Sequence, residues 1–442
     1  MKSRIGRIFF SLFATLISLP AFADGGTNVD YSPYSKFGIG VLANPGTAYT
    51  RSMGGVGVAT RDNRYLNVMN PAAVTARDTL AFMADFSLAQ NNSYYQQGDV
   101  KSVNNTFNIR SLSMSFPIWK SSAFMIGFAP FSSVAYEVTS KETDPAVIGH
   151  TGNITDAFVG TGSMYQLYVG AGATFWKRLS VGAQFTYYFG NLEKSSTRNF
   201  SSSNYRSIYY GTQMTLHGFN GKLGLQYEQP IGNKNKLIAG LTYRMPTKLR
   251  GPDKDARNPH GKIEIMQTAI QSDIVDTLLS SYVSLGNVNI AQEFGFGLSY
   301  HHGDKWSAEV NYTFADWQNS QMDKVTGFKL DGFTANRSQS INAGFEIVPN
   351  RSDIRYYMRR CSYRVGGYYN VEYYKYNGNA ITSYGVTLGM SLPVFRWYNA
   401  LTVGVDFGQR GSLKNNMMRE RYVGFNVSLN VFDIWFRKPM YE

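Results

Sequence analysis

Histidine, the side chain most often used for proton transfer at neutral pH, is scarce in this sequence. Five histidines occur among 442 residues, and the adjacent pair His301 and His302 falls in a segment with strand-like alternation. Neighbouring side chains on a strand point to opposite faces, so a metal ion shared by this pair is not expected. No serine lies in a Gly-x-Ser-x-Gly motif, the mark of one large class of hydrolases. The sequence therefore predicts no catalytic residue, no metal site and no cofactor.

Two glycine motifs and one cysteine could also carry chemistry. Gly55-Val56-Gly57 lacks the third glycine of a dinucleotide-binding loop, and Gly170-Ala171-Gly172 lies inside a strand-like segment. We interpret both as small residues that allow close packing. Cys361 is the only cysteine, so it cannot form a disulfide within the chain. Stability must then come from a closed ladder of backbone hydrogen bonds.

The stretch from Phe37 to Ala76 is irregular and rich in glycine. Its composition favours turns and close backbone approach over strands or helices. We interpret residues 24–76 as a compact plug, or hatch, for something hollow. The residues that carry this interpretation are Gly54, Gly55, Gly57 and the closing triplet Asn70, Pro71 and Ala72.

Residues 1–23 read as a secretory signal peptide. Three basic residues precede an apolar run from Ile8 to Leu19, and Ala21-Phe22-Ala23 forms a small-x-small cleavage site. The mature chain would then begin near Asp24. A membrane anchor is the alternative, but the apolar run is shorter than the roughly 20 residues that a spanning helix needs.

Residues 77–442 show the composition and alternation of a β-barrel. Aromatic residues make up 15% of the chain and charged residues 17%, with 43 glycines. This mixture is typical of a wall that faces lipid on one side and water on the other, although a soluble all-β protein could share it. In the clearest segment, apolar Val181 and Phe185 alternate with Ser180 and Gln184. We count about 14 such segments and predict an all-β fold, an antiparallel transmembrane β-barrel of about 14 strands.

The connections between these segments alternate in length. Outer-membrane barrels carry short periplasmic turns and long extracellular loops, so the sequence predicts a multi-pass barrel in the outer membrane of a Gram-negative bacterium. The formal net charge of +13 would then face anionic lipid head groups rather than nucleic acid, which an exported chain rarely meets. Long connections are expected at about 91–105, 138–162, 192–208, 247–290 and 318–336.

The connection at 247–290 has a pattern of its own. Apolar residues recur there at steps of three or four, which predicts an amphipathic helix over the outer mouth of the barrel. Its apolar stripe could gather a hydrophobic ligand, or it could cap the barrel by packing on other loops. The stripe consists of Ile263, Met266, Ile270, Ile274, Leu278 and Tyr282.

Charged residues on the inner face of the strands are expected to hold the hatch. Buried charges persist when they are paired, and Arg61, Asp62 and Arg64 of the hatch need partners. A hydrolase housed in the barrel remains the alternative use of such groups. The alternation places six candidates on the inner face: Asp85, Arg244, Glu309, Arg364, Asp406 and Arg410.

Several of these motifs resemble one known family. The glycine-rich start that ends in Asn70-Pro71-Ala72 resembles the hatch of the FadL/TodX family of outer-membrane transporters for hydrophobic compounds. Phe294-Gly295-Phe296-Gly297-Leu298-Ser299-Tyr300, followed by Trp306, Tyr312-Thr313 and Trp317, resembles a strand pair of that family. The opening Tyr31-Ser32-Pro33-Tyr34-Ser35 and the ending Asp433-Ile434-Trp435-Phe436-Arg437-Lys438 resemble its Bacteroidetes branch.

The resemblance implies a channel for passive uptake of hydrophobic or amphipathic small molecules. Extracellular loops would catch the ligand, which would enter the lumen and leave sideways through a kinked third strand. In this sequence Pro130 interrupts that strand and withholds a ladder hydrogen bond. The exit is therefore expected at Pro130, Phe131 and Ser132, with an ordinary bulge as the alternative.

The resemblance leaves a second function open. Related barrels of the Bacteroidetes branch serve as subunits of outer-membrane secretion or assembly machines without transport. A transporter predicts an apolar path from the loops to the exit, whereas a scaffold predicts a filled lumen and apolar patches on loops or turns. The expected partners are outer-membrane lipid together with a hydrophobic ligand, or with other outer-membrane proteins or lipoproteins.

Overall fold

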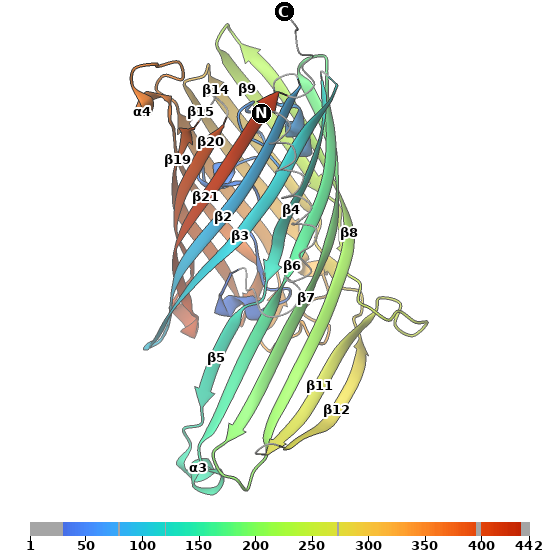
Figure 1. The fold of residues 1–442 in the computed structure, drawn as a ribbon. Helices are drawn as coiled ribbons and strands as arrows, with labels where there is room; N and C mark the ends of the chain where they lie inside the picture. The colour runs from blue at the N-terminus through green and yellow to red at the C-terminus, as the bar shows by residue number, and fades with distance from the viewer. Residues whose placement is uncertain (1–29, 78–79, 120, 272–273, 395–398, 435–442) are drawn as a thin grey trace, which may run out of the picture.

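Fourteen antiparallel strands close into a barrel in the computed structural model (Figure 1), which confirms the predicted fold class. The model describes residues 30–77, 80–119, 121–271, 274–394 and 399–434, so the predicted signal peptide at 1–23 lies outside the described residues. The first barrel strand, β2 (Ala81–Gln97), pairs with the last, β21 (Arg419–Ile434), and this pairing closes the wall. Between them the wall consists of β3 (Val100–Trp119), β4 (Ser122–Ser133), β6 (Ile154–Phe175), β7 (Leu179–Phe200), β8 (Ser207–Ile231), β9 (Asn235–Arg244), β14 (Glu293–His302), β15 (Trp306–Asp316), β17 (Arg337–Ile347), β18 (Ser362–Tyr376), β19 (Asn379–Pro393) and β20 (Ala400–Gly411).

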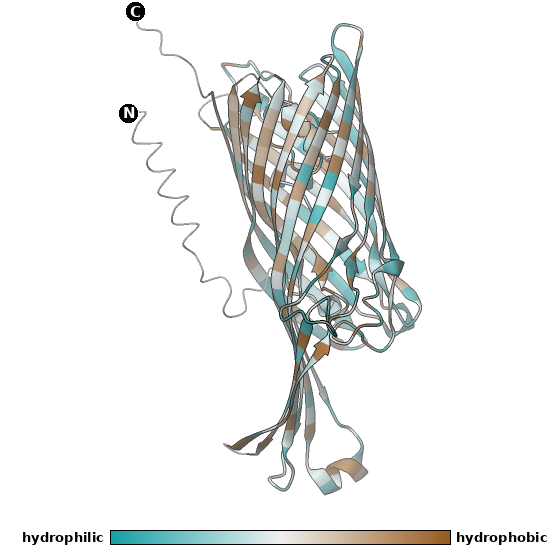
Figure 2. Cartoon of the chain, turned by 90° about the vertical axis from the view of Figure 1, so that its right-hand side faces the viewer, coloured by the Kyte–Doolittle hydropathy of each residue, from teal (hydrophilic) through white to brown (hydrophobic). Residues whose placement is uncertain are grey.

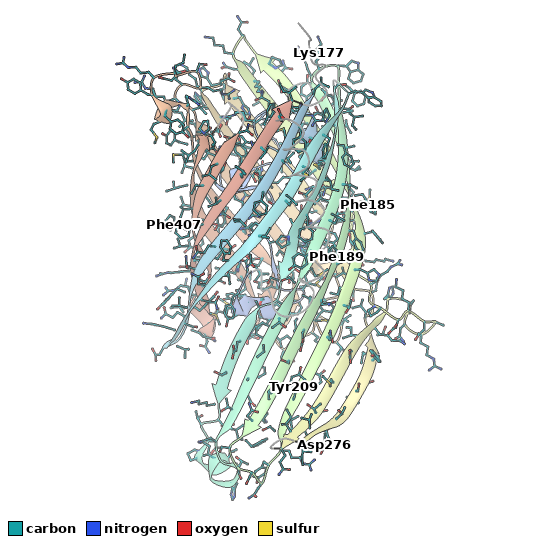
Figure 3. The ribbon with its side chains drawn as sticks, in the orientation of Figure 1. Lys177, Phe185, Phe189, Tyr209, Asp276 and Phe407 are labelled. Atoms are coloured by element: carbon teal, nitrogen blue, oxygen red, sulfur yellow. The ribbon has the colours of Figure 1, made fainter. Side chains whose placement is uncertain are left out.

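Side-chain alternation explains why these segments form a wall with two different faces. In β7, Val181 and Phe185 are exposed on the outer face, whereas Ser180 and Thr186 are buried on the inner face. Phe185 and Phe407 lie on the outside of the barrel in Figure 3, and apolar and polar residues alternate along the strands in Figure 2. The closed ladder satisfies the backbone without a disulfide, and Cys361 is a buried free thiol.

The two ends of the barrel differ. One end, which we call the turn rim, carries tight turns at Lys177 and Gly303 and the short helix α4 (Tyr357–Arg360). The opposite end, the loop rim, carries η4 (Trp317–Asn319), β16 (Phe333–Ala335), η5 (Lys414–Asn416) and the paired short strands β10 (Thr247–Lys248) and β13 (Asn289–Ile290). Within the described parts of the chain, no helix is both long and apolar enough to cross a membrane.

An open sheet projects from one side of the loop rim (Figures 1 and 2). The long strands β6, β7 and β8 continue into it beyond the barrel. On one side β5 (Tyr136–Lys141) pairs with β6, and on the other β11 (Lys262–Gln271) pairs with β8 and β12 (Ile274–Ser284) pairs with β11. The helix α3 (Pro145–Thr151) joins β5 to β6.

The prediction of an amphipathic helix over the mouth of the barrel is wrong, because this part of the chain forms the strands β11 and β12. β11 pairs with the edge of β8 from Glu264↔Gln213 to Ile270↔Ser207, and this strand edge offers backbone partners that a helix could not use. Ile263 and Ile265 are buried at a spacing of two, which is the period of the strand that forms. The predicted stripe is thus divided between two strands, with Ile263, Met266 and Ile270 on β11 and Ile274, Leu278 and Tyr282 on β12.

The long loop expected at 91–105 is also absent. β2 and β3 run through this region and are joined by a tight turn at Gly98, which has a φ of +56°. The polar residues there belong to strands that extend past the barrel wall. Their polarity was therefore misinterpreted as the mark of a loop.

The chain before β2 consists of short elements joined by turns, as its glycines predict. These are η2 (Pro33–Lys36), β1 (Val41–Leu42), α2 (Ala48–Arg51) and η3 (Pro71–Thr75). η3 lies against β6, β7 and β8, while α2 lies against β19, β20 and β21. This N-terminal segment, residues 30–77, therefore contacts the inner face of the wall on opposite sides. Its expected start near Asp24 lies outside the described residues.

Candidate functional site

Glycines of the wall lie directly against the backbone of the N-terminal segment, and we call these contact positions, which include Gly182 and Gly366, the glycine seat. A Cβ added at Gly366 of β18 would lie 2.2 Å from the backbone nitrogen of Gly54, and one at Gly182 of β7 would lie 2.3 Å from the carbonyl carbon of Pro71. Any side chain at these wall positions would push the segment away. Gly54 is one of the predicted hatch residues, whereas its wall partners were not predicted; their signal in the sequence is glycine at lumen-facing positions of the alternating strands.

Residues of the predicted hatch motif contact these wall glycines at two places, Gly54 at Gly366 and Pro71 at Gly182. Asn70 is fully buried, donates its side-chain amide to the carbonyl of Val58 at 2.8 Å and accepts from the backbone N–H of Ala72 at 3.0 Å, which caps η3. Gly54 donates its N–H to the Thr387 hydroxyl at 2.7 Å. Gly55 has a φ of +82°, which favours glycine. A Cβ on Gly57 would lie 2.4 Å from the sulfur of Met69 within the same segment.

A buried charge cluster fixes the segment to β17 and β18. Glu346 accepts from Arg364 at 2.7 Å and also pairs with Arg64 of the segment, which in turn pairs with Asp62. The guanidinium of Arg364 lies over the ring of Tyr49, 4.3 Å from its centroid. Both arginines were predicted to take part in holding the hatch, whereas Glu346 was not, although Glu346 alternates with the outward residues Phe345 and Ile347.

The other expected inner-face charges divide into two groups. Glu309, like Arg364, contacts the N-terminal segment directly, because it accepts from the backbone N–H of Ala59 at 3.0 Å and from the Thr60 hydroxyl. The remaining four contact other residues of the wall: Asp85 with Ser87, Arg244 with Glu293, Asp406 with Tyr368, and Arg410 with Glu372 and Glu420.

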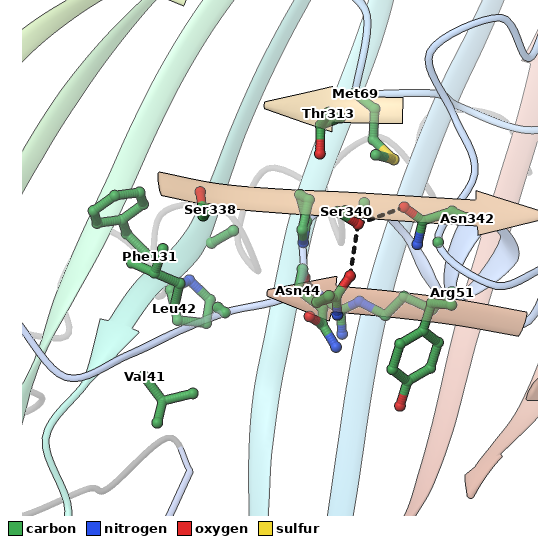
Figure 4. A pocket seen from close by; sticks show the side chains of 18 of the residues that line it. Val41, Leu42, Asn44, Arg51, Met69, Phe131, Thr313, Ser338, Ser340 and Asn342 are labelled. Atoms are coloured by element: carbon green, nitrogen blue, oxygen red, sulfur yellow. Dashed lines mark hydrogen bonds between the residues drawn. The ribbon is translucent and has the colours of Figure 1, made fainter. Parts of the chain in front are cut away.

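A cavity of about 310 Å³ lies between this segment and the wall. Its lining mixes apolar and polar side chains; in Figure 4, Val41, Leu42 and Phe131 lie toward one side and Arg51 and Asn342 toward the other. Arg51 donates to the carbonyl of Asn44 at 2.7 Å, and its Nε has no hydrogen-bond partner among the described residues. The cavity can therefore hold a molecule with one polar and one apolar end.

The wall loses its pairing beside this cavity. β3 pairs with β4 from Trp119↔Ser122 to Leu112↔Phe128, but the rest of β3 toward the loop rim pairs with β2 alone. We call the unpaired junction, between residues 100–111 of β3 and 129–133 of β4, the β3–β4 seam. β4 shows a register shift against β6 between Pro130 and Ser132. Pro130 and Phe131 line the cavity, so the predicted exit residues lie where the cavity reaches the seam.

The start of the N-terminal segment bridges the seam. Val41 and Leu42 pair with Ser133 and Ser132 of β4. Asp30 forms an ion pair of 2.7 Å with Arg110 of β3, and its backbone N–H donates to the Ser133 hydroxyl at 3.3 Å. Residues 30–42 thus link β3 and β4 across the seam, where the two strands do not pair with each other.

A second cavity, also of about 310 Å³, lies at the turn rim below the segment. Its lining is dominated by polar and charged side chains, including Arg61, Asp62, Arg77 and Arg351. Arg61 lies 3.6 Å from Glu228 of the wall. An apolar molecule would meet charges in this direction, whereas in the direction of the seam it would meet Phe131 and Leu42 beside the Asp30–Arg110 ion pair.

The predicted loop-capture residues lie on the projecting sheet, away from the cavity lining. Ile263 is buried, Ile270 is half-buried, and Met266, Ile274, Leu278 and Tyr282 are exposed. Among the described residues, no group of three or more histidine, cysteine or carboxylate side chains is arranged to hold a metal ion.

Comparisons with known proteins agree with this architecture. A family model described as BamG matches residues 5–442, whereas a search of curated proteins found no match. Among solved structures, the CymD monoaromatic hydrocarbon channel is 16% identical, with 87% of this chain and 97% of that chain covered and a TM-score of 0.54. The toluene transporter TbuX of Ralstonia pickettii is 14% identical, with 87% and 97% covered and a TM-score of 0.55. The toluene transporter TodX of Pseudomonas putida is 13% identical, with 89% and 99% covered and a TM-score of 0.57. These similarities confirm the fold that the FadL/TodX resemblance implied.

Proposed function

The chain belongs to the BamG family, and from its barrel and the N-terminal segment packed against the inner wall we propose an outer-membrane protein that passes hydrophobic or amphipathic small molecules sideways into the bilayer. One observation carries the proposal: the cavity, which is lined by both apolar and polar side chains, reaches the β3–β4 seam at Pro130 and Phe131. The names of the similar structures, which are channels and transporters for toluene and monoaromatic hydrocarbons, support the apolar part of this ligand class.

The outer face of the barrel supports a membrane location. Exposed apolar residues cover the strands, and Trp119 and Trp176 are exposed at the turn rim, where tryptophan typically marks a membrane–water interface. In the orientation usual for such barrels, the turn rim faces the periplasm and the loop rim faces outward. The signal peptide expected at residues 1–23 would deliver the chain there.

A ligand in the cavity could move in two directions, toward the periplasm or toward the β3–β4 seam. Movement toward the periplasm is opposed by the charge cluster of Arg64 and Glu346 and by the polar cavity beneath it. Movement toward the seam requires only that residues 30–42 shift, because the wall has no ladder to break there. Arg51 would hold the polar end of an amphipathic ligand, and the exposed residues of β12, such as Leu278 and Tyr282, would collect ligand outside.

We expect Pro130→Val to reduce sideways passage several-fold. Valine restores the backbone N–H that proline lacks, and it favours strand conformation. β4 could then form regular ladder hydrogen bonds next to its register shift. The measurement is uptake of a radiolabelled alkylbenzene by cells that carry the full-length protein, with heat-modifiable migration on gels as the folding control. Undiminished uptake by a folded Pro130→Val variant would remove the seam from the route.

Asp30→Ala should have the opposite effect and raise uptake several-fold. The substitution leaves the buried Arg110 without its carboxylate partner and frees residues 30–42 from β3. Hydrogen exchange of residues 30–42 should accelerate together with uptake. Asp156→Ala is the matched control, because it breaks an exposed ion pair with Arg198 on the projecting sheet. If exchange accelerates without a change in uptake, the bridge does not gate passage.

A second function, an accessory subunit of an outer-membrane complex, is favoured by the projecting sheet. Its last strand, β12, pairs with β11 on one side and has no strand on the other side within the described residues. Such an edge can accept a strand of another protein. Native purification from the membrane separates the two functions: a bound amphipathic small molecule supports passage, and stoichiometric protein partners support the accessory role.

A further inference from the structure

The connection between β17 and β18 is much longer than the other turns of the turn rim and is basic. It contains four arginines and one acidic residue, Asp353, within residues 350–360. It also contains α4, which Figure 1 shows at the outer margin of the barrel at the turn rim. We call this connection the α4 turn. Apart from Arg351, which lines the second cavity, its residues take no part in holding the N-terminal segment or in the ligand route.

Hydrogen bonds hold the α4 turn in one shape. The carboxylate of Asp353 accepts from the backbone N–H groups of Tyr356 at 2.8 Å and Arg355 at 2.9 Å. The bond from Tyr356, supported by that from Arg355, lowers the pKa of Asp353, so this carboxylate stays ionised while serving the turn itself. The hydroxyl of Tyr357 donates to the carbonyl of Pro393 at 2.9 Å, which fixes the turn to β19.

Two of the four guanidinium groups have no carboxylate partner among the described residues. Arg351 lies 3.5 Å from Asp304 and Arg359 lies 3.4 Å from Asp353. Arg355 and Arg360 instead lie against tyrosine rings, 5.4 Å from the centroid of Tyr356 and 5.7 Å from that of Tyr357. A guanidinium stacked on a ring keeps its N–H edge available for an anion.

Exposed apolar residues lie next to these cations in the sequence of the turn. Ile354 is 97% exposed and Met358 is 54% exposed, which is costly in water but not beside lipid chains. Lys177, labelled at the same end of the barrel in Figure 3, follows the exposed Trp176. The α4 turn therefore lies at the rim where the membrane interface is expected, with both apolar and cationic groups displayed.

We propose that the α4 turn is a docking site for an anionic phospholipid of the periplasmic leaflet. The guanidinium groups of Arg355 and Arg360 bind the phosphate of the head group, and Ile354 and Met358 contact the acyl chains. This inference rests on the proposed membrane location and is independent of ligand passage through the seam. Bidentate guanidinium–phosphate geometry selects arginine over lysine at both positions.

The test is native mass spectrometry of the full-length protein in detergent, titrated with phosphatidylglycerol or with phosphatidylethanolamine of the same acyl chains. The first phosphatidylglycerol should bind roughly tenfold more tightly than phosphatidylethanolamine, because its head group carries a net negative charge whereas that of phosphatidylethanolamine is neutral overall. In the double variant Arg355→Gln and Arg360→Gln this preference should disappear. The matched control, Lys324→Gln and Lys329→Gln, removes two exposed charges from the loop rim and should keep the preference.

Three outcomes would overturn the proposal. The first is equal binding of the two lipids by the unaltered protein, and the second is a preference that survives in the α4-turn variant. The third is complete displacement of phosphatidylglycerol by millimolar inorganic phosphate, which would indicate a small-anion site without contribution from the acyl chains. Alkylbenzene uptake should remain unchanged in the α4-turn variant, so failure here is distinguishable from failure of the seam route.

Discussion

Deletion of residues 24–76 is expected to turn the closed barrel into an open pore. The N-terminal segment contacts opposite sides of the inner wall through η3 and α2, and its Tyr34, Phe37 and Ile39 form part of the buried apolar cluster at the loop rim. Without the segment, an inner face rich in polar residues would fill with water. Single-channel conductance in planar bilayers should rise by roughly tenfold or more, since larger empty barrels conduct as aqueous pores.

One control and one further variant make this result specific. Removal of the β11–β12 hairpin, residues 262–284, leaves the seat of the segment intact and should keep conductance low. Gly366→Val is a full-length version of the test, because its side chain would collide with the backbone of Gly54 and displace the segment. A deletion variant that migrates as a folded barrel yet remains closed would contradict a plugged pore.

The barrel was predictable because the alternation of outward apolar and inward polar residues, which is local in sequence, identifies each strand. Val181 and Phe185 face outward because of their parity along the chain, and the same parity repeated in other segments gave the number of strands. Asn70 and Gly54 were recognisable as turn and close-contact residues from their types alone. Their positions follow from local chemistry and required no knowledge of strand register.

The contacts between the segment and the wall were not predictable, because they depend on register between distant strands. Gly182 and Gly366 lie opposite Pro71 and Gly54 only after the barrel closes. Glu346 had the correct parity for the inner face, but nothing local distinguished it from other inward residues. The β11–β12 hairpin was misassigned for a related reason, since Ile263 and Ile270 fit a helical period until the edge of β8 becomes available.

Loss of the charge on Glu346 should be the most damaging single change in the lumen. Glu346 is 2% exposed and is shared by Arg64 of the segment and Arg364 of the wall, so Glu346→Gln would leave two buried guanidinium groups without their common counter-ion. Removing one member of a buried ion pair typically costs about 3–5 kcal/mol. The midpoint of heat-modifiable migration should fall, and transient openings should appear in bilayer recordings.

Glu228→Gln supplies a matched control for this prediction. It is the same substitution in a wall glutamate that also pairs with an arginine of the segment, but the Glu228 side chain is 29% exposed and lies 3.6 Å from Arg61. Partly solvated pairs contribute up to about 1 kcal/mol, so this variant should stay closed and nearly as stable as the unaltered protein. Equal losses of stability in both variants would mean that the buried ion pairs of Glu346 hold the segment no more strongly than the partly exposed pair of Glu228. In that case the glycine seat, which positions the backbone of Gly54 and Pro71 directly on the wall, would have to hold the segment without help from charge.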